Sequence, residues 1–364
     1  MKVQMILQDC YVDDLITGAD TIEEAIESQR QIRSLLAKGQ FPIHKWCAND
    51  ARILSDIPDN EREKLVYLNQ TSADQVIKTL GLIWNPSSDK FLFTFDLISD
   101  DKPITKRRLF SIVARLFDPL GFLSPTVVLA KQLMQKTWVA KLKWDCPLEG
   151  ELLETWSKFY SALQYINKIE IPRFFSVPGS STIELHGFAV ASAHAYGACL
   201  YVRSINDEGY CTSRLLCSKS KIAPLKDLTN PHKELCAALL LTRLTRKVLP
   251  ALQMHFSVIR LWLDSQIVLA WLKKPPSLLK SFNQTHVNEI VSNNDNFSWS
   301  YVRSKEKPAD VVSRGQLPEK LKLNQLLWEG PSFLKFGNYQ PMALDDIPDD
   351  ELPDMKPVSV LVMS

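Results

Sequence analysis

The chain has 364 residues, of which 45% are hydrophobic and 23% are charged, and its net charge is +2. This balance is that of ordinary folded domains, and the length suits roughly two or three of them. No apolar run approaches the roughly 18 residues of a membrane span, and the N-terminal apolar run is too short for a secretory signal. We therefore expect an intracellular, cytoplasmic protein without a membrane partner. The seven cysteines are odd in number and include no C-x-x-C pair, which disfavours zinc and disulfides.

The N-terminal residues 3–18 read as a hairpin, because Val3, Met5 and Leu7 alternate with other residues before Tyr11-Val12-Asp13-Asp14. A helix is predicted next. Thr21 and Glu24 form a capping-box pattern at its start, and Gly39 ends it.

Two β-prone runs, 79–84 and 90–96, flank a turn sequence, Asn-Pro-Ser-Ser-Asp. From 105 to about 166 the spacing of apolar residues becomes helical, with one break at the proline- and glycine-containing segment 117–125. The first part of the chain is therefore expected to combine strands with helices.

The segment 171–181 contains two prolines and a glycine and is a plausible boundary. Beyond it the patterns predict three strands (183–190, 196–203, 210–217), a helix (231–248), a strand (256–263), helices (267–273, 281–292), a strand (297–302) and a helix (307–314). Asn230 and Pro231 supply the cap and the first-turn proline of the long helix. This order predicts a mixed sheet with helices packed on it.

Paired carboxylates form the first candidate site. Asp13 and Asp14, at the tip of the predicted hairpin, offer the oxygen ligands that Mg²⁺ prefers. Two metal ions held there could clamp both oxygens of a phosphoryl transfer. A polar turn is the ordinary alternative for two adjacent aspartates, since aspartate is common in turns.

Three further acids are spread over the second half. Glu234 is predicted in the first turn of the long helix, Asp264 directly after an apolar strand, and Asp310 at the entry of the last helix. Acids at a strand end and in helix first turns can meet at one edge of a sheet and bind metal. The alternative is that each acid favours a helix N-terminus through the helix dipole.

Eight segments in chain order carry a family resemblance. They are YVDDLITGADTIEEA, FPIHKW, TLGLIWNPSSDKFLF, FDPLGFLSPTVVLAK, LHGFAVASAHAYGA, SKSKIAPLKDLTNPHKELCAALL, LWLDSQIVLAWL and KEKPADVVSRG. Over about residues 9 to 335 the chain resembles the pol polyprotein of Pao/Bel-family retrotransposons. The same region of such elements carries the label "Pao retrotransposon peptidase", but the sequence has no D-T/S-G triplet to support peptidase chemistry.

The resemblance implies a fold of α+β and α/β type in four parts. These are the C-terminal part of a reverse-transcriptase palm (1–100), a helical thumb or connection (101–170), a ribonuclease H-like domain with a mixed sheet and flanking helices (180–316), and a linker or tail toward a missing integrase region (317–364). Mg²⁺ is the ancestral cofactor. Nucleic acid, as RNA, DNA or their hybrid, is the implied partner, with other parts of the retroelement polyprotein beside it.

The resemblance also implies roles for the five acids. Asp13 and Asp14 resemble the metal ligands of the palm. Glu234, Asp264 and Asp310 resemble three of the four ribonuclease H acids.

The sequence departs from the family at both metal sites. The family places its first ribonuclease H acid where this chain has Val190, which cannot coordinate Mg²⁺. Glu184 lies roughly 20 Å earlier along the same strand, and His194 is a soft ligand for a hard ion. The chain also begins just before YVDD, so the palm strand that brings a third aspartate is not in it.

We therefore expect a catalytically defective fragment of reverse transcriptase and ribonuclease H ancestry. Two alternatives stay open: a non-catalytic module that binds nucleic acid or serves as a scaffold, and a residual Mg²⁺-dependent ribonuclease acting on RNA–DNA hybrid. The stretch Asp345–Asp354 is acidic and proline-containing, and is expected to be a tail.

Overall fold

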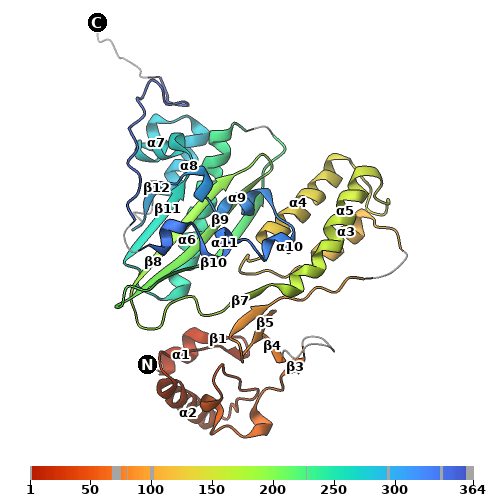
Figure 1. Cartoon of the computed structure of the whole chain (residues 1–364), viewed down its shortest axis with the longest axis vertical. Helices are drawn as coiled ribbons and strands as arrows, with labels where there is room; N and C mark the ends of the chain where they lie inside the picture. The colour runs from red at the N-terminus through yellow and green to blue at the C-terminus, as the bar shows by residue number, and fades with distance from the viewer. Residues whose placement is uncertain are drawn as a thin grey trace. The chain divides into compact units, whose positions relative to one another are not determined.

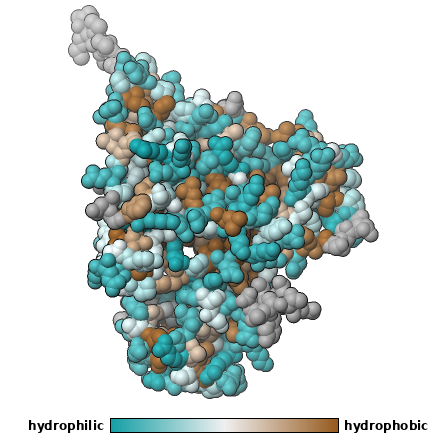
Figure 2. All heavy atoms as spheres, viewed as in Figure 1, coloured by the Kyte–Doolittle hydropathy of each residue, from teal (hydrophilic) through white to brown (hydrophobic). Residues whose placement is uncertain are grey.

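The computed structural model describes residues 2–67, 75–79, 81–98, 102–226, 228–292, 296–336 and 339–357. It divides into two compact units, one formed by Met1–Thr94 with Asn167–Phe174 and the other by Phe95–Ile166 with Phe175–Ser364. Within the described ranges, none of the helices has the length and apolarity needed to cross a membrane. Figure 2 shows hydrophobic residues interspersed among hydrophilic ones on the visible face, which is the usual surface of a folded protein.

The first unit combines a short helical part with a five-stranded sheet. Its helices are α1 (Lys2–Asp9), α2 (Ile22–Lys38), η1 (Ala51–Leu54) and η2 (Asp59–Glu61), and its small hairpin is β1 (Cys10–Tyr11) and β2 (Asp14–Leu15). The sheet has the order β3 (Val66–Tyr67), β4 (Gln75–Thr79), β5 (Leu82–Asn85), β6 (Lys90–Leu92) and β7 (Glu170–Pro172), with all neighbours antiparallel. The strand β7 thus returns to this unit from the segment that the sequence analysis treats as a boundary.

The predicted first strand of the N-terminal hairpin is wrong, because residues 2–9 form the helix α1. The hairpin is confined to residues 10–15, where Tyr11 pairs with Asp14. Three alternating apolar residues are too few to separate the two periodicities, and the segment is rich in helix formers such as Met, Leu, Gln and Lys. Leu7, the last residue of the alternating run, is exposed.

Local signals elsewhere in this unit are confirmed. The Thr21 side chain accepts a hydrogen bond from the backbone N–H of Glu24 at 3.2 Å, and Gly39 is the C-cap of α2. The predicted turn joins β5 to β6, where Ile83 pairs with Leu92.

The second unit begins with three helices, α3 (Lys106–Val113), α4 (Ser124–Val139) and α5 (Gly150–Ala162), followed by η3 (Leu163–Lys168). Its strands are β8 (Ser180–Ala191), β9 (Ala195–Asn206), β10 (Cys211–Ile222), β11 (Val258–Leu263) and β12 (Ser298–Tyr301). Its other helices are α6 (Asn230–Leu252), α7 (Gln266–Lys273), η4 (Pro276–Leu278), α8 (Ser281–Val291), η5 (Ser304–Glu306), α9 (Ala309–Arg314), α10 (Pro318–Leu321), α11 (Gln325–Glu329) and η6 (Ser332–Lys335). The element order predicted for the second half of the chain is confirmed.

The five strands of this unit form one mixed sheet of order β10-β9-β8-β11-β12. The first three are antiparallel neighbours, while β11 runs parallel to both β8 and β12. The long helix α6 starts with Pro231 in its first turn, as predicted, but its N-cap is Thr229 rather than Asn230. The predicted ribonuclease H-like mixed sheet with flanking helices is therefore confirmed.

Alternate residues of β8 face different layers, as the strand geometry requires. Leu185 and Ala189 belong to the core cluster that includes α6 residues such as Leu241. Phe188, on the other face, lies 6.4 Å from the Phe333 ring, measured between centroids, in the segment after α11. Figure 1 shows α6 and the blue helices α9 and α11 on opposite faces of the green strands.

The C-terminal part of the chain is fastened to that second face by a buried polar network. Arg203 donates to the carbonyl oxygen of Leu334 at 2.8 Å and pairs with Glu184 at 2.6 Å. The Tyr201 hydroxyl donates to the carbonyl of Leu327 at 2.6 Å. Glu184 is therefore engaged in the interior of the sheet and is no substitute ligand, as its distance along β8 predicts.

The helices α3–α5 and the sheet belong to the same compact unit. Part of their junction is the loop 117–123, where Gly121 has φ of +77° and a Cβ there would lie 1.8 Å from the carbonyl oxygen of Ser218 on β10. Glycine is required at this approach. Burial raises the pKa of Asp118 in this loop to about 7, opposed by backbone N–H donors that include that of Leu123. The four-part division predicted from the sequence stays a prediction.

Candidate functional site: a carboxylate cluster closed by a lysine

Three elements of the second unit bring the predicted acids into one region. Asp264 follows the last residue of β11, and Asp310 lies in the first turn of α9, both as predicted. Glu234 lies just beyond the first turn of α6, because that helix begins at Asn230. The charge of Asp264 contributes to the raised pKa of Glu234, so these two carboxylates are neighbours.

A lysine occupies the centre of this group. The Nζ atom of Lys307 lies 2.6 Å from Oδ2 of Asp264 and 4.0 Å from Oδ1 of Asp310. The side chains of Lys307 and Asp264 are only 16% and 13% exposed. A charge-assisted hydrogen bond of this length between two largely buried side chains is a strong one. The ammonium group thus supplies the positive charge that the acids need.

Asp310 has a second cationic partner. Arg314, one helical turn later on α9, donates from Nε to both carboxylate oxygens of Asp310 at 2.8 and 2.9 Å. The adjacent carboxylate raises the pKa of the Arg314 guanidinium. Asp310 is therefore held toward its own helix by Arg314.

The negative charge of Glu234 is compensated less by basic side chains than the charges of Asp264 and Asp310. Burial and, to a smaller extent, the charge of Asp264 raise its pKa, while a hydrogen bond with Ser265 and the charge of Lys307 oppose that rise. Crowded carboxylates resist ionisation in this way.

Val190, in place of the family's first acid, is 2% exposed and lies near the end of β8. Leu263 and Ala189 form the last parallel pair between β11 and β8, and Asp264 and Val190 are the next residues of the two chain segments. On the other side Val190 pairs with Gly197. A Cβ on Gly197 would lie 2.6 Å from the carbonyl of Ala309, so α9 packs directly on this part of the sheet.

These residues do not fit a resident Mg²⁺ in the arrangement observed. Over the described ranges, no three or more His, Cys, Asp or Glu side chains are grouped so that they could hold a metal ion. The ligand direction of Asp264 is taken by the Lys307 ammonium, and Val190 contributes no oxygen. Hard cations require several oxygen ligands together.

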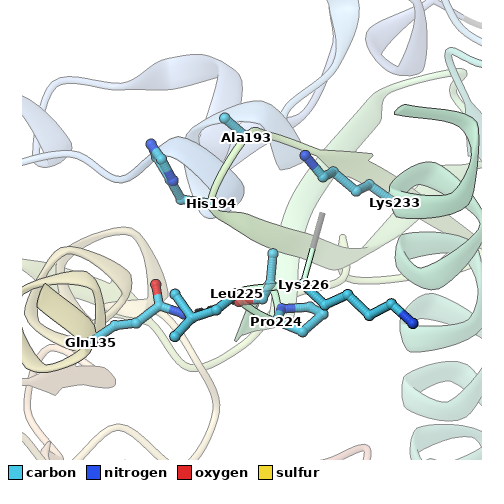
Figure 3. A pocket seen from close by; sticks show the side chains of 8 residues that line it. Gln135, Ala193, His194, Pro224, Leu225, Lys226 and Lys233 are labelled. Atoms are coloured by element: carbon cyan, nitrogen blue, oxygen red, sulfur yellow. Dashed lines mark hydrogen bonds between the residues drawn. The ribbon is translucent and has the colours of Figure 1, made fainter. Parts of the chain in front are cut away.

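A small pocket lies next to the N-terminal end of α6. It has a volume of about 140 Å³ and is lined by Gln135, His194, Leu225, Lys226 and Lys233 among others. Figure 3 shows Lys233 extending from α6 toward the hairpin turn that carries His194.

The other predicted pair lies in the first unit. Asp13 lies on the two-residue turn between β1 and β2, Asp14 is the first residue of β2, and both are exposed. Val12 at this turn has a φ of 57°, an unusual conformation for a β-branched residue. The hairpin therefore presents both carboxylates to solvent, and their role as palm ligands stays a prediction.

Sequence reasoning did not single out Lys307 or Arg314. A signal was available, because both are spaced by one helical turn from Asp310, three residues before and four after it. Such pairs are common on helix surfaces, so the spacing alone would not have placed Lys307 against Asp264.

The sheet order, the helix that follows three antiparallel strands, and the acids at the strand end and helix starts define a ribonuclease H-like domain. Residues 105–265 match the family described as "Pao retrotransposon-like RNaseH-like domain". The matched part runs from the N-cap of α3 to Ser265 and is similar to the ribonuclease H-like domains of Pao retrotransposons. No curated protein matches the sequence.

Solved structures are similar to parts of this chain, at low sequence identity. Ribonuclease H1 of the halophilic archaeon Halobacterium salinarum is 15% identical, covering 36% of this chain and 94% of its own, with a TM-score of 0.24. The N-terminal ribonuclease H domain of rv2228c from Mycobacterium tuberculosis is 9% identical, covering 36% and 93%, with a TM-score of 0.25. A foamy viral protease–reverse transcriptase in complex with double-stranded DNA is 16% identical, covering 63% and 45%, with a TM-score of 0.22. The assignment therefore depends on the family match and on the topology of the sheet.

Proposed function

We propose that the chain is a ribonuclease H-like module that binds nucleic acid, RNA–DNA hybrid above all, without hydrolysing it. The observation that supports this most is the position of Lys307, whose ammonium lies 2.6 Å from Asp264 where a hydrolase of this fold would need a metal ion. A tethered cation can neutralise the acids permanently, but it cannot activate water as a bound metal does.

The substitution at position 190 supports the same proposal. Without an acid there, the number of carboxylates near the cluster falls to three, and a single ammonium with one guanidinium balances most of their charge. The domain can keep its fold without metal, which would suit a part retained for binding.

The reverse-transcriptase ancestry of the first part also belongs to this proposal. The hairpin with Asp13 and Asp14 and the helices α3–α5 are interpreted as remnants of palm and thumb. We propose that these two aspartates alone support no polymerisation, since a two-metal site needs more carboxylates than two.

The test uses the purified chain with a labelled RNA–DNA hybrid. Binding is measured by fluorescence anisotropy over a salt series and cleavage by gel electrophoresis with Mg²⁺. We expect binding that weakens as salt rises, as phosphate contacts require, and no cleavage. Mg²⁺-dependent cleavage that Asp264→Asn abolishes would establish the residual ribonuclease instead. An absence of binding at low salt would reject the nucleic-acid proposal altogether.

A further inference from the structure

The acidic segment Asp345–Asp354 lies against the second unit instead of extending away from it. It carries six carboxylates in ten residues. Its neighbours in the chain form bridges to the domain, Met342 with Tyr301 of β12 and Met355 with Leu279. Figure 1 shows this blue segment along the edge of the sheet beside β12 and on to the helices α7 and α8.

Each lysine between the end of α7 and the start of α8 is paired with an acid of this segment. Lys273 Nζ lies 2.6 Å from Oδ1 of Asp346, Lys274 pairs with Asp349, and Lys280 Nζ lies 3.2 Å from Oδ1 of Asp354. The acidic segment thus neutralises a basic surface, which we call the α7–α8 lysine surface (Lys273, Lys274 and Lys280), although Lys273 and Lys280 stay 64% and 62% exposed.

The downstream end of the segment is firmly anchored. Leu352 is 4% exposed within the core cluster that contains Trp271 and Leu279. The Trp271 indole N–H donates to the carbonyl of Pro353 at 2.8 Å, and the backbone N–H of Lys280 donates to that of Asp354 at 2.9 Å. Removing exposed charges upstream should therefore leave this anchor intact.

The upstream pairs are of a different kind. The side chains of Asp346 and Asp349 are 83% and 62% exposed. Exposed ion pairs contribute little to stability and are screened by salt, so another polyanion can replace these carboxylates on the lysines.

The lysine surface is close to the carboxylate cluster. The helix α7 starts two residues after Asp264 and ends at Lys273. Its eight residues span about 12 Å at roughly 1.5 Å per residue. A nucleic-acid backbone that passes the cluster could therefore also reach these lysines.

We propose that the α7–α8 lysine surface binds the phosphate backbone of nucleic acid, and that the acidic segment shields it by occupying the same lysines. This inference rests on the proposed nucleic-acid function and adds a surface and a competitor to it. The segment acts as an internal polyanion, so nucleic acid binds in exchange for Asp346 and Asp349.

The test compares two variants with the same change in net charge. Asp346→Asn with Asp349→Asn removes the acidic partners of Lys273 and Lys274. Asp350→Asn with Glu351→Gln changes two exposed acids of the same segment that lie outside the three lysine pairs. Hybrid affinity is measured for the full chain by anisotropy at several salt concentrations, with thermal unfolding as the folding check.

We expect the first variant to bind roughly three- to thirtyfold more tightly than wild type, as the loss of two competing exposed pairs allows, and the control to gain much less. Adding Lys273→Gln and Lys274→Gln to the first variant should remove the gain. Equal affinities of the first variant and the control would overturn the inference while leaving the proposed function in place. If none of these proteins binds at low salt, the proposed function fails and the inference with it.

Discussion

The sequence predicts two groups of acids as metal ligands, and the structure compensates the charges of the two groups differently. Asp13 and Asp14 lie exposed on a short hairpin, where water solvates them. Asp264 is only 13% exposed and has the Lys307 ammonium at 2.6 Å. Burial requires a partner for a carboxylate, whereas exposure does not.

This difference teaches that a set of acids in the right fold order does not by itself imply a metal. The neutralising charge can come from a cation of the chain itself, and three residues before Asp310 the chain supplies one. We therefore expect the free energy of unfolding to depend strongly on the charges around Asp264 and Lys307. It should hardly depend on the charges of Asp13 and Asp14.

The largest effect is expected from Val190→Asp without metal. The new carboxylate would be buried beside Asp264 and would lose the apolar packing of valine, so the free energy of unfolding should fall by about 3 kcal/mol. Val190→Asn, of similar size but uncharged, separates the charge effect from the packing effect in denaturant unfolding. A rise in melting temperature for Val190→Asp without metal would contradict the view that valine relieves repulsion among the acids.

Removal of the internal cation by Lys307→Met should have the next largest effect. Asp264 would keep its charge and lose its ion-pair partner, which should lower the free energy of unfolding by about 2 kcal/mol, less than for a fully buried pair. Lys90→Met is a matched control because Lys90 pairs with Glu170 at 2.7 Å in an exposed position. Equal losses in the two variants would show that Lys307 has no special role.

Glu234→Gln should have a smaller, pH-dependent effect. Burial raises the pKa of Glu234 above its ordinary value in the folded state. Ionisation is then less favourable in the folded than in the unfolded chain, so its stability contribution is present at low pH and lost as pH rises through the folded pKa. The variant should be more stable than wild type at neutral pH, with the difference vanishing in acid. A difference that grows in acid would show the opposite sign of pKa shift.

The smallest effect is expected from Asp13→Asn with Asp14→Asn. Since both side chains are exposed, the melting temperature should change little, by the equivalent of about 0.5 kcal/mol at most. A larger loss in the same unfolding assay would mean that the hairpin charges contact other groups and that the contrast with the closed cluster is false.

The sequence predicted the second unit better than the first for a physical reason. The strands β8–β12 and the helices between them are marked by periodic apolar runs, and the positions of Asp264 and Asp310 follow from those runs. The helix α1 was predicted as a strand because the alternation of Val3, Met5 and Leu7 is too short to separate the two periodicities.

Long-range contacts were not predictable in the same way. The pairing of Lys307 with Asp264 joins two elements 43 residues apart. The docking of the acidic segment on Lys273 and Lys280 likewise depends on packing that no local pattern encodes.

The most direct test of the account is the response of thermal unfolding to Mg²⁺. Wild type is compared with the double variant Val190→Asp/Lys307→Met, which restores the missing carboxylate and removes the internal cation. A ligand that binds only the folded state raises its melting temperature. We predict that Mg²⁺ leaves wild type unchanged and stabilises the double variant. Stabilisation of wild type by Mg²⁺ that Asp264→Asn abolishes would contradict the claim that Lys307 replaces the metal.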